Sequence, residues 1–187
     1  ADLMDQELAG IYSFNVMLEG PADAMAQADT LARMERLSDA LRRQPMVRQV
    51  TSVVDYVKRT NQQLEGGSQA AHVLPASAEA IAQELFVFGL SDEGRLELER
   101  VVASDYSRAH ITVKLASMSS DVVFEQINQA EREAAVVFAG SGITPTVTGS
   151  GRIFSTLDRY LVVSQLSSFG TAFVTVFSRT IVTDGDQ

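Results

Sequence analysis

The chain has 187 residues, of which 45% are hydrophobic and 21% charged, a composition typical of a globular protein with one large or two small domains. Acidic residues (24) outnumber Lys and Arg (15), and the resulting net charge of -9 argues against a nucleic-acid-binding surface. The absence of cysteine excludes disulfides, thiol catalysis and cysteine-ligated zinc. The composition therefore argues against an enzyme before any motif is considered.

The first third of the sequence predicts a strand–helix–strand unit. Apolar and polar residues alternate over Ile11–Leu18, which predicts a half-buried strand that ends at Gly20-Pro21. Residues 22–43 carry apolar side chains at helical spacing, so we expect a helix that ends before Pro45. Val47–Val54 is rich in β-branched residues and predicts a second strand. Such a unit lays two parallel strands side by side through a right-handed crossover.

The middle of the chain, about residues 55–90, predicts a helical insertion. A short helix is expected over 55–64 and a second one over 78–89. The segment EGGSQAAHVLP between them is polar and contains glycine, which is typical of a loop.

Two segments after the insertion predict a β-hairpin around the turn SDYS. The second arm, 108–116, is a clear strand because its apolar residues alternate and share one face: Ala109, Ile111, Val113 and Leu115. The first arm, 97–103, also fits the continuation of a helix from Gly94, and this alternative stays open.

The last third predicts a second strand–helix–strand unit. Ser120-Asp121 is typical of a helix start, Gly140 of its end, and 143–148 reads as the last strand. Together the elements predict an α+β fold in which residues 1–152 form one domain. Two strand–helix–strand units with helices on one face of the sheet make the expected arrangement ferredoxin-like.

The two ends of the chain differ in character. The N-terminal segment ADLMDQELAG is polar, shows no signal-peptide pattern and lacks an initial Met, so we expect an excised or processed piece. Residues 153–187 predict a C-terminal helix and a polar tail. The uncharged stretch Phe169–Phe177 stops at Arg179, short of the about 20 apolar residues that a membrane span needs. It is either a buried or amphipathic helix or the first turns of a membrane helix.

No motif predicts catalysis, a cofactor or a metal. His72 and His110 have no second histidine at ligand spacing, so both read as surface residues. Two carboxylate pairs, Asp92-Glu93 and Glu97 with Glu99, fall in a charged turn and strand, where nothing indicates the shielded cleft that acid–base catalysis needs. We therefore expect no catalytic, cofactor-binding or metal site.

Aromatic residues supply the candidate contacts. Phe86 and Phe88 lie two positions apart near a helix end and cannot share one face, so one of them is expected to be exposed. Both are candidates for contact with hydrophobic cargo or a partner. Tyr56 and Tyr106, each preceded by Asp, are interpreted as structural anchors.

Several segments, in their order along the chain, resemble one family. These are Val50-Thr51-Ser52-Val53-Val54-Asp55-Tyr56-Val57-Lys58 followed by Asn61 and Leu64, then Leu74-Pro75, then Thr148-Gly149, and finally Tyr160-Leu161-Val162-Val163-Ser164-Gln165 before an apolar stretch. Over residues 10–177 the chain resembles an extracytoplasmic loop domain of an RND-superfamily exporter of the MmpL/Patched-like branch. The family's helix after Ser164-Gln165 continues for a full span, whereas the apolar stretch here stops at Phe177.

The resemblance implies a proton-driven transporter in a bacterial inner membrane. The chain would be a porter-like domain on its periplasmic side that captures hydrophobic or lipid-like molecules and relays conformational change. Its partners would be the cargo, the transmembrane helices, the second loop and further copies in a homo-oligomer, with no nucleic acid. The alternative is a free-standing soluble α+β ligand-binding or sensory module that dimerises through its C-terminal helix.

Overall fold

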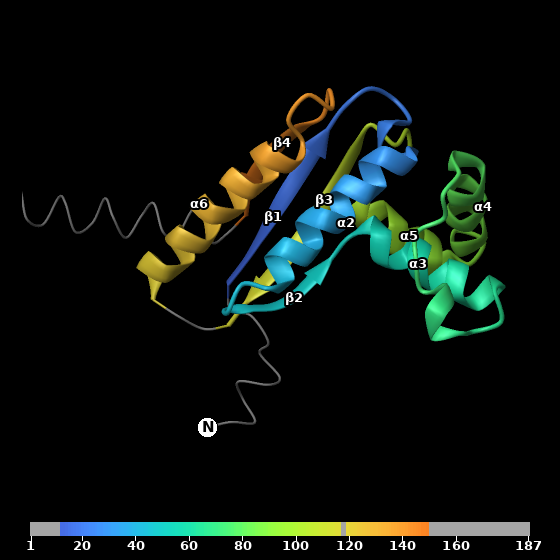
Figure 1. Cartoon of the computed structure of the whole chain (residues 1–187), viewed down its shortest axis with the longest axis horizontal. Helices are drawn as coiled ribbons and strands as arrows, with labels where there is room; N and C mark the ends of the chain where they lie inside the picture. The colour runs from blue at the N-terminus through green and yellow to red at the C-terminus, as the bar shows by residue number, and fades with distance from the viewer. Residues whose placement is uncertain (1–11, 117–118, 150–187) are drawn as a thin grey trace, which may run out of the picture.

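The computed structural model describes residues 12–116 and 119–149, and the predicted C-terminal helix and the N-terminal segment lie outside them. Within the described residues (Figure 1), the elements in chain order are β1 (Tyr12–Glu19), the 3-10 turn η1 (Ala24–Ala26), α2 (Ala28–Arg42), β2 (Val47–Thr51), α3 (Val53–Leu64), the 3-10 turn η2 (Gln69–Ala71), α4 (Ala78–Phe88), α5 (Asp92–Val101), β3 (Arg108–Leu115), α6 (Ser120–Val137) and β4 (Thr144–Thr148). No helix in this part of the chain is long and apolar enough to cross a membrane.

The strands form one four-stranded antiparallel sheet in the order β2-β3-β1-β4, which confirms the predicted α+β class. β1 and β2 are parallel to each other, but β3 lies between them and pairs with both. The expectation that these two strands lie side by side is therefore wrong. The crossover through α2 leaves room for one strand, and β3 fills it in the opposite direction.

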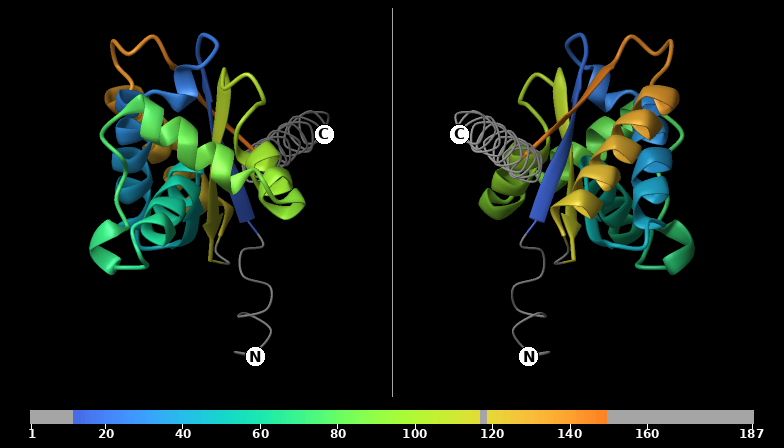
Figure 2. Two further views of the ribbon diagram at one scale, coloured as in Figure 1. Left: turned by 90° about the vertical axis from the view of Figure 1, so that its right-hand side faces the viewer. Right: turned by 90° about the vertical axis from the view of Figure 1, so that its left-hand side faces the viewer.

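α2 and α6 cover one face of the sheet, and Figure 2 shows both on the same side. Phe14, Val16 and Leu18 of β1 are fully buried, as the alternating pattern predicts. α2 contributes a stripe of fully buried apolar side chains to the same core: Leu31, Met34, Leu37 and Leu41. Their spacing of three to four residues places them on one side of the helix.

The helices of the insertion occupy residues 53–101, more than the predicted 55–90. Residues 97–101 follow the helix alternative and not the hairpin arm, because they belong to α5. Residues 102 and 103 do meet β3, through a bridge of Val102 to Ala109 and a hydrogen bond from Ala103 N to the carbonyl of Arg108 at 2.9 Å. The Oγ atom of Ser91 caps α5 by accepting a hydrogen bond from Gly94 N at 3.0 Å. Its acidic first turn also favours a helix start. α5 lies on the opposite side of the sheet from α2 and α6 (Figure 2).

Two predicted boundaries differ from the structure. β2 ends at Thr51 rather than Val54, because Ser52 and Asp55 form a capping box that begins α3. The helix predicted over 22–43 begins only at Ala28, because Gln27 is extended (φ -78°, ψ 138°) and separates α2 from the 3-10 turn η1. Asp23, which precedes η1, takes a left-handed conformation (φ 62°).

β2 and β4 are the outer strands of the sheet. The pairing of β2 with β3 shifts register between Val47 and Gln49. β4 contains Pro145, which lies opposite Leu18 of β1. Each outer strand therefore carries an irregularity.

Candidate functional site

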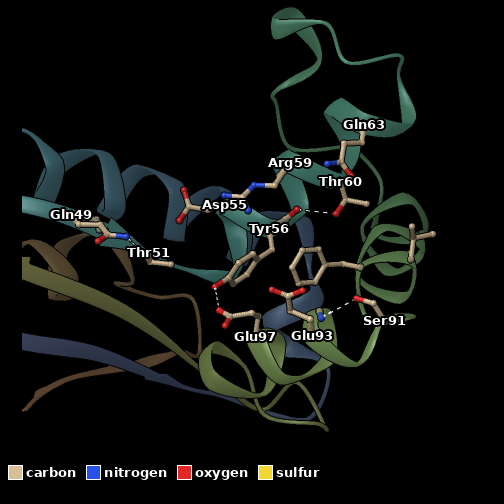
Figure 3. Close-up of a pocket in the computed structure, with 14 residues that line it drawn as sticks. Gln49, Thr51, Asp55, Tyr56, Arg59, Thr60, Gln63, Ser91, Glu93 and Glu97 are labelled. Carbon is tan, nitrogen blue, oxygen red and sulfur yellow. Dashed lines mark hydrogen bonds between the residues drawn. The ribbon is translucent and has the colours of Figure 1, made fainter. Parts of the chain in front are cut away.

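An open cavity of about 720 Å³ lies where the end of β2 meets the helical insertion (Figure 3). We call it the insertion groove. Its lining comes from β2 (Gln49, Val50, Thr51), from α3 (Asp55, Tyr56, Arg59, Thr60, Gln63) and from the end of α4 through α5 (Val87, Phe88, Ser91, Glu93, Gly94, Glu97). This volume is in the range of small-molecule sites.

Tyr56 lies at the centre of the groove. Its hydroxyl donates a hydrogen bond to Glu97 Oε2 at 3.0 Å, and its ring centroid is 4.9 Å from that of Phe88. Burial of the ring raises the pKa of Tyr56, and the bond to Glu97 raises that pKa further, so the phenol stays a neutral donor. Tyr56 thereby ties α3 to α4 and α5, the anchoring role predicted for it.

The wall formed by α3 is fixed by charged groups. Asp55 Oδ2 accepts a hydrogen bond from Ser52 N at 2.8 Å, while its Oδ1 pairs with Arg42 Nη2 of α2 at 2.6 Å. The same Arg42 nitrogen donates to the carbonyl of Val50 at 3.3 Å. These contacts join α2, β2 and α3 on one side of the groove.

Three further residues that carry the family resemblance have structural roles, whereas residues 160–165 lie outside the described residues. Lys58 Nζ is 2.6 Å from Glu35 Oε1, and Asn61 Nδ2 donates to the carbonyl of Ala71 at 2.9 Å. Gly149 has φ 128°, and a Cβ atom there would lie 2.9 Å from Cα of Phe14. Close packing against β1 therefore requires glycine at this position.

Two charged side chains of the groove lie on different walls. Arg59 comes from α3 and Glu93 from α5, both are exposed, and neither has an ion pair with another described residue. Glu97 lies one turn after Glu93 and faces the same groove (Figure 3). The carboxylates that come together are thus Glu93 and Glu97, because the segment is a helix and not the predicted strand.

The candidate contact residues Phe86 and Phe88 face different surroundings. Phe86 is 68% exposed and lies outside the groove lining. Phe88 is partly buried, packs on Tyr56 and lines the groove. As their spacing predicts, one of the two is exposed, and the groove places only Phe88 in position to touch a bound molecule.

Glu84 of α4 is a buried carboxyl group that the sequence reasoning missed. It is 4% exposed, and its Oε2 atom has no hydrogen-bond partner among the described residues. Burial, with a smaller contribution from the charge of Glu65, raises the pKa of Glu84 to about 7. A signal was present, because Glu84 falls on the apolar stripe with Ile81 and Leu85.

The two histidines are both half-buried. His72 Nδ1 lies 3.2 Å from Gln62 Oε1, and His110 is half-buried on β3. Within residues 12–116 and 119–149, no group of three or more histidine or acidic side chains is placed to hold a metal ion. No protein-family model matches the chain, and no curated protein matches it.

Proposed function

We propose that the chain is a periplasmic porter-like domain of an RND-type transporter in a bacterial inner membrane, and that it captures hydrophobic or lipid-like cargo. The sheet order β2-β3-β1-β4, with α2 and α6 on one face, is the observation that supports this proposal. It is the order expected of a ferredoxin-like fold with units β1-α2-β2 and β3-α6-β4. The α3–α5 insertion is then an addition between the two units.

In this proposal the insertion groove holds the cargo. Phe88 and Val87 give it an apolar wall, and Tyr56 gives it an aromatic floor. The groove lies at the junction of the sheet and the insertion, so a bound molecule touches β2, α3 and α5 together. Bound cargo would draw these elements together, and this movement would relay binding to the rest of the domain.

The two phenylalanines offer a matched test with an uncharged lipid-like probe. Dodecyl maltoside is titrated below its micelle concentration into the 187-residue chain, and heat is measured by calorimetry. Phe88→Ala is expected to weaken binding roughly tenfold, because it removes the groove wall, whereas Phe86→Ala leaves binding unchanged. Equal effects of the two variants, with circular dichroism showing both folded, would refute cargo capture in the groove.

Location is tested in intact cells. The chain has no cysteine, so Ala70→Cys in an exposed loop adds a single thiol to this domain of the full protein. A maleimide that does not cross the inner membrane is expected to label this domain in the variant and not in the unsubstituted protein, as read from the tryptic peptide that contains position 70. Labelling that requires cell lysis contradicts the periplasmic location.

A free-standing ligand-binding or sensory module is the second candidate. The polar lining favours it, since Gln49, Thr51 and Gln63 offer hydrogen bonds that an alkyl chain cannot use. This candidate predicts binding of polar solutes with no gain from an alkyl tail.

A further inference from the structure

The insertion groove presents two opposite charges that the described protein leaves without partners. Arg59 extends above Tyr56 and Glu93 lies below it, on the side of α5 (Figure 3). Both side chains are exposed, so each remains hydrated and available to a ligand. A molecule that lies across Tyr56 would meet both charges at once.

The remaining charged groups of the lining are already committed. Asp55 is held by Arg42 at 2.6 Å. Glu97 accepts from the Tyr56 hydroxyl through one oxygen and pairs with Arg100 through the other, at 3.0 Å each. A ligand therefore finds one cationic and one anionic group to satisfy.

The aromatic pair Tyr56 and Phe88 indicates which end of a ligand would lie at Glu93 and which at Arg59. The ring of Tyr56 packs against that of Phe88 beside Glu93, and an ammonium group is attracted both to an aromatic face and to a carboxylate. Arg59 is near enough to Tyr56 for its positive charge to oppose the rise in the tyrosine pKa. Its planar guanidinium suits a phosphate or carboxylate.

We propose that the insertion groove binds a zwitterion, with its ammonium group at Glu93 beside the Tyr56 and Phe88 rings and its anionic group at Arg59. Resting on the proposed function, this zwitterion is the headgroup of an amphiphilic cargo whose tail lies along Val87. The same chemistry could come from a free polar solute, and the experiment separates these sources.

Four probes are titrated into the 187-residue chain by calorimetry, all below their micelle concentrations. Dodecylphosphocholine carries both charges and a tail, and glycerophosphocholine carries both charges without a long tail. Dodecyltrimethylammonium carries the tail and the ammonium alone, and dodecyl maltoside carries the tail without charge. Dodecylphosphocholine is expected to bind roughly tenfold more tightly than dodecyl maltoside.

Charge-removing variants assign the contacts. Glu93→Gln and Arg59→Gln are each expected to weaken dodecylphosphocholine binding roughly three- to fivefold, the upper part of the range of a solvent-accessible ion pair. Glu99→Gln on α5 and Arg36→Gln on α2 remove equivalent exposed charges outside the groove lining and serve as matched controls. Circular dichroism establishes that all four variants fold.

Each outcome separates this inference from the proposed function. Equal affinity for dodecyl maltoside and dodecylphosphocholine, unchanged by Glu93→Gln, overturns the zwitterion and leaves capture of lipid-like cargo standing. Equal affinity for glycerophosphocholine and dodecylphosphocholine, with no binding of dodecyl maltoside, supports the zwitterion and overturns lipid-like cargo. If Glu93→Gln weakens dodecylphosphocholine binding and Arg59→Gln does not, the groove recognises only a cationic group, which overturns the zwitterion. If none of the probes binds, both proposals are overturned.

Discussion

Two regions of the molecule differ in how they bury side chains. One is the framework, which we define as the sheet with α2 and α6, and the other is the helical insertion of residues 53–101. The framework closes its core with fully buried side chains such as Phe14, Leu37 and Ile111. The insertion buries a carboxyl group at Glu84 and exposes five large apolar side chains, on three helices and in two connecting segments: Leu64, Val73, Phe86, Leu90 and Leu96. The rest of the described chain exposes three: Met46, Val122 and Val136. Of the two regions, the insertion leaves more large apolar side chains exposed, and it also supplies most of the groove.

The largest expected change in stability comes from comparing a phenylalanine of the framework with one of the insertion. Phe14→Ala removes a fully buried ring and is expected to lower the free energy of unfolding by about 3–5 kcal/mol. Phe86→Ala removes a ring that is mostly exposed and is expected to change it by less than about 0.5 kcal/mol. Urea denaturation measures both, and similar losses would contradict the distinction between the two regions.

Glu84 gives the insertion a dependence on pH. Its pKa of about 7 in the folded chain lies above the ordinary value of 4.5, so the folded state keeps a proton that the unfolded state loses. Stability is therefore expected to fall by about 3 kcal/mol as the pH rises from 4.5 to 7 and to change no further above that.

Replacement of the acid tests this dependence. Glu84→Gln is expected to remove the fall, so that the variant exceeds the natural chain in urea resistance at pH 8 but not at pH 4.5. Glu79→Gln, on the exposed side of the same helix, is the control. A parallel pH profile for the natural chain and Glu84→Gln would show that Glu84 ionises normally.

Gly94 tests how tightly α4 and α5 fit together. A Cβ atom there would lie 2.0 Å from the carbonyl oxygen of Phe88, so the backbone has to move. Gly94→Ala is expected to cost about 1–3 kcal/mol and to speed amide hydrogen exchange in α4 and α5 only. Glu99→Ala on the exposed side of α5 is the control, and faster exchange throughout β1 and β3 would mean that the two regions unfold together.

A smaller loss of stability is expected when the hydrogen bond between α3 and α5 is removed. Tyr56→Phe keeps the ring on Phe88 but removes the hydrogen bond to Glu97, at an expected cost of about 1 kcal/mol. Hydrogen exchange in α5 is expected to rise while exchange in α2 stays constant. Unchanged exchange in α5 would show that this bond does not hold the helix.

The framework could be predicted from the sequence because its burial is periodic. Phe14, Val16 and Leu18 alternate with polar residues, and the same period in β3 places Ile111 and Val113 on the core side. The order of the strands could not be predicted in the same way. Nothing in the alternation says that β3 separates β1 from β2, because pairing partners are chosen by packing over long sequence separations.

The insertion was harder to predict because its apolar residues fit both the helical period of about 3.6 residues and the strand period of about 2. Leu98, Val101 and Val102 are buried in a helix and its end, yet their neighbours also fit an alternating strand. The helix start at Ser91 was the signal that decides between them. The groove itself forms only through tertiary packing, since Arg59 and Glu93 lie on separate helices and no local motif joins them.

The irregular outer strands determine how this sheet can meet other chains. Pro145 has no amide hydrogen, so β4 lacks one of the donors that an incoming strand would use. On β2, the register shift next to the exposed charge of Arg48 breaks the even row of donors and acceptors at the other edge. Strand addition and templated fibril growth are therefore disfavoured at both edges, and partners that approach the described part of the chain are directed to its helices.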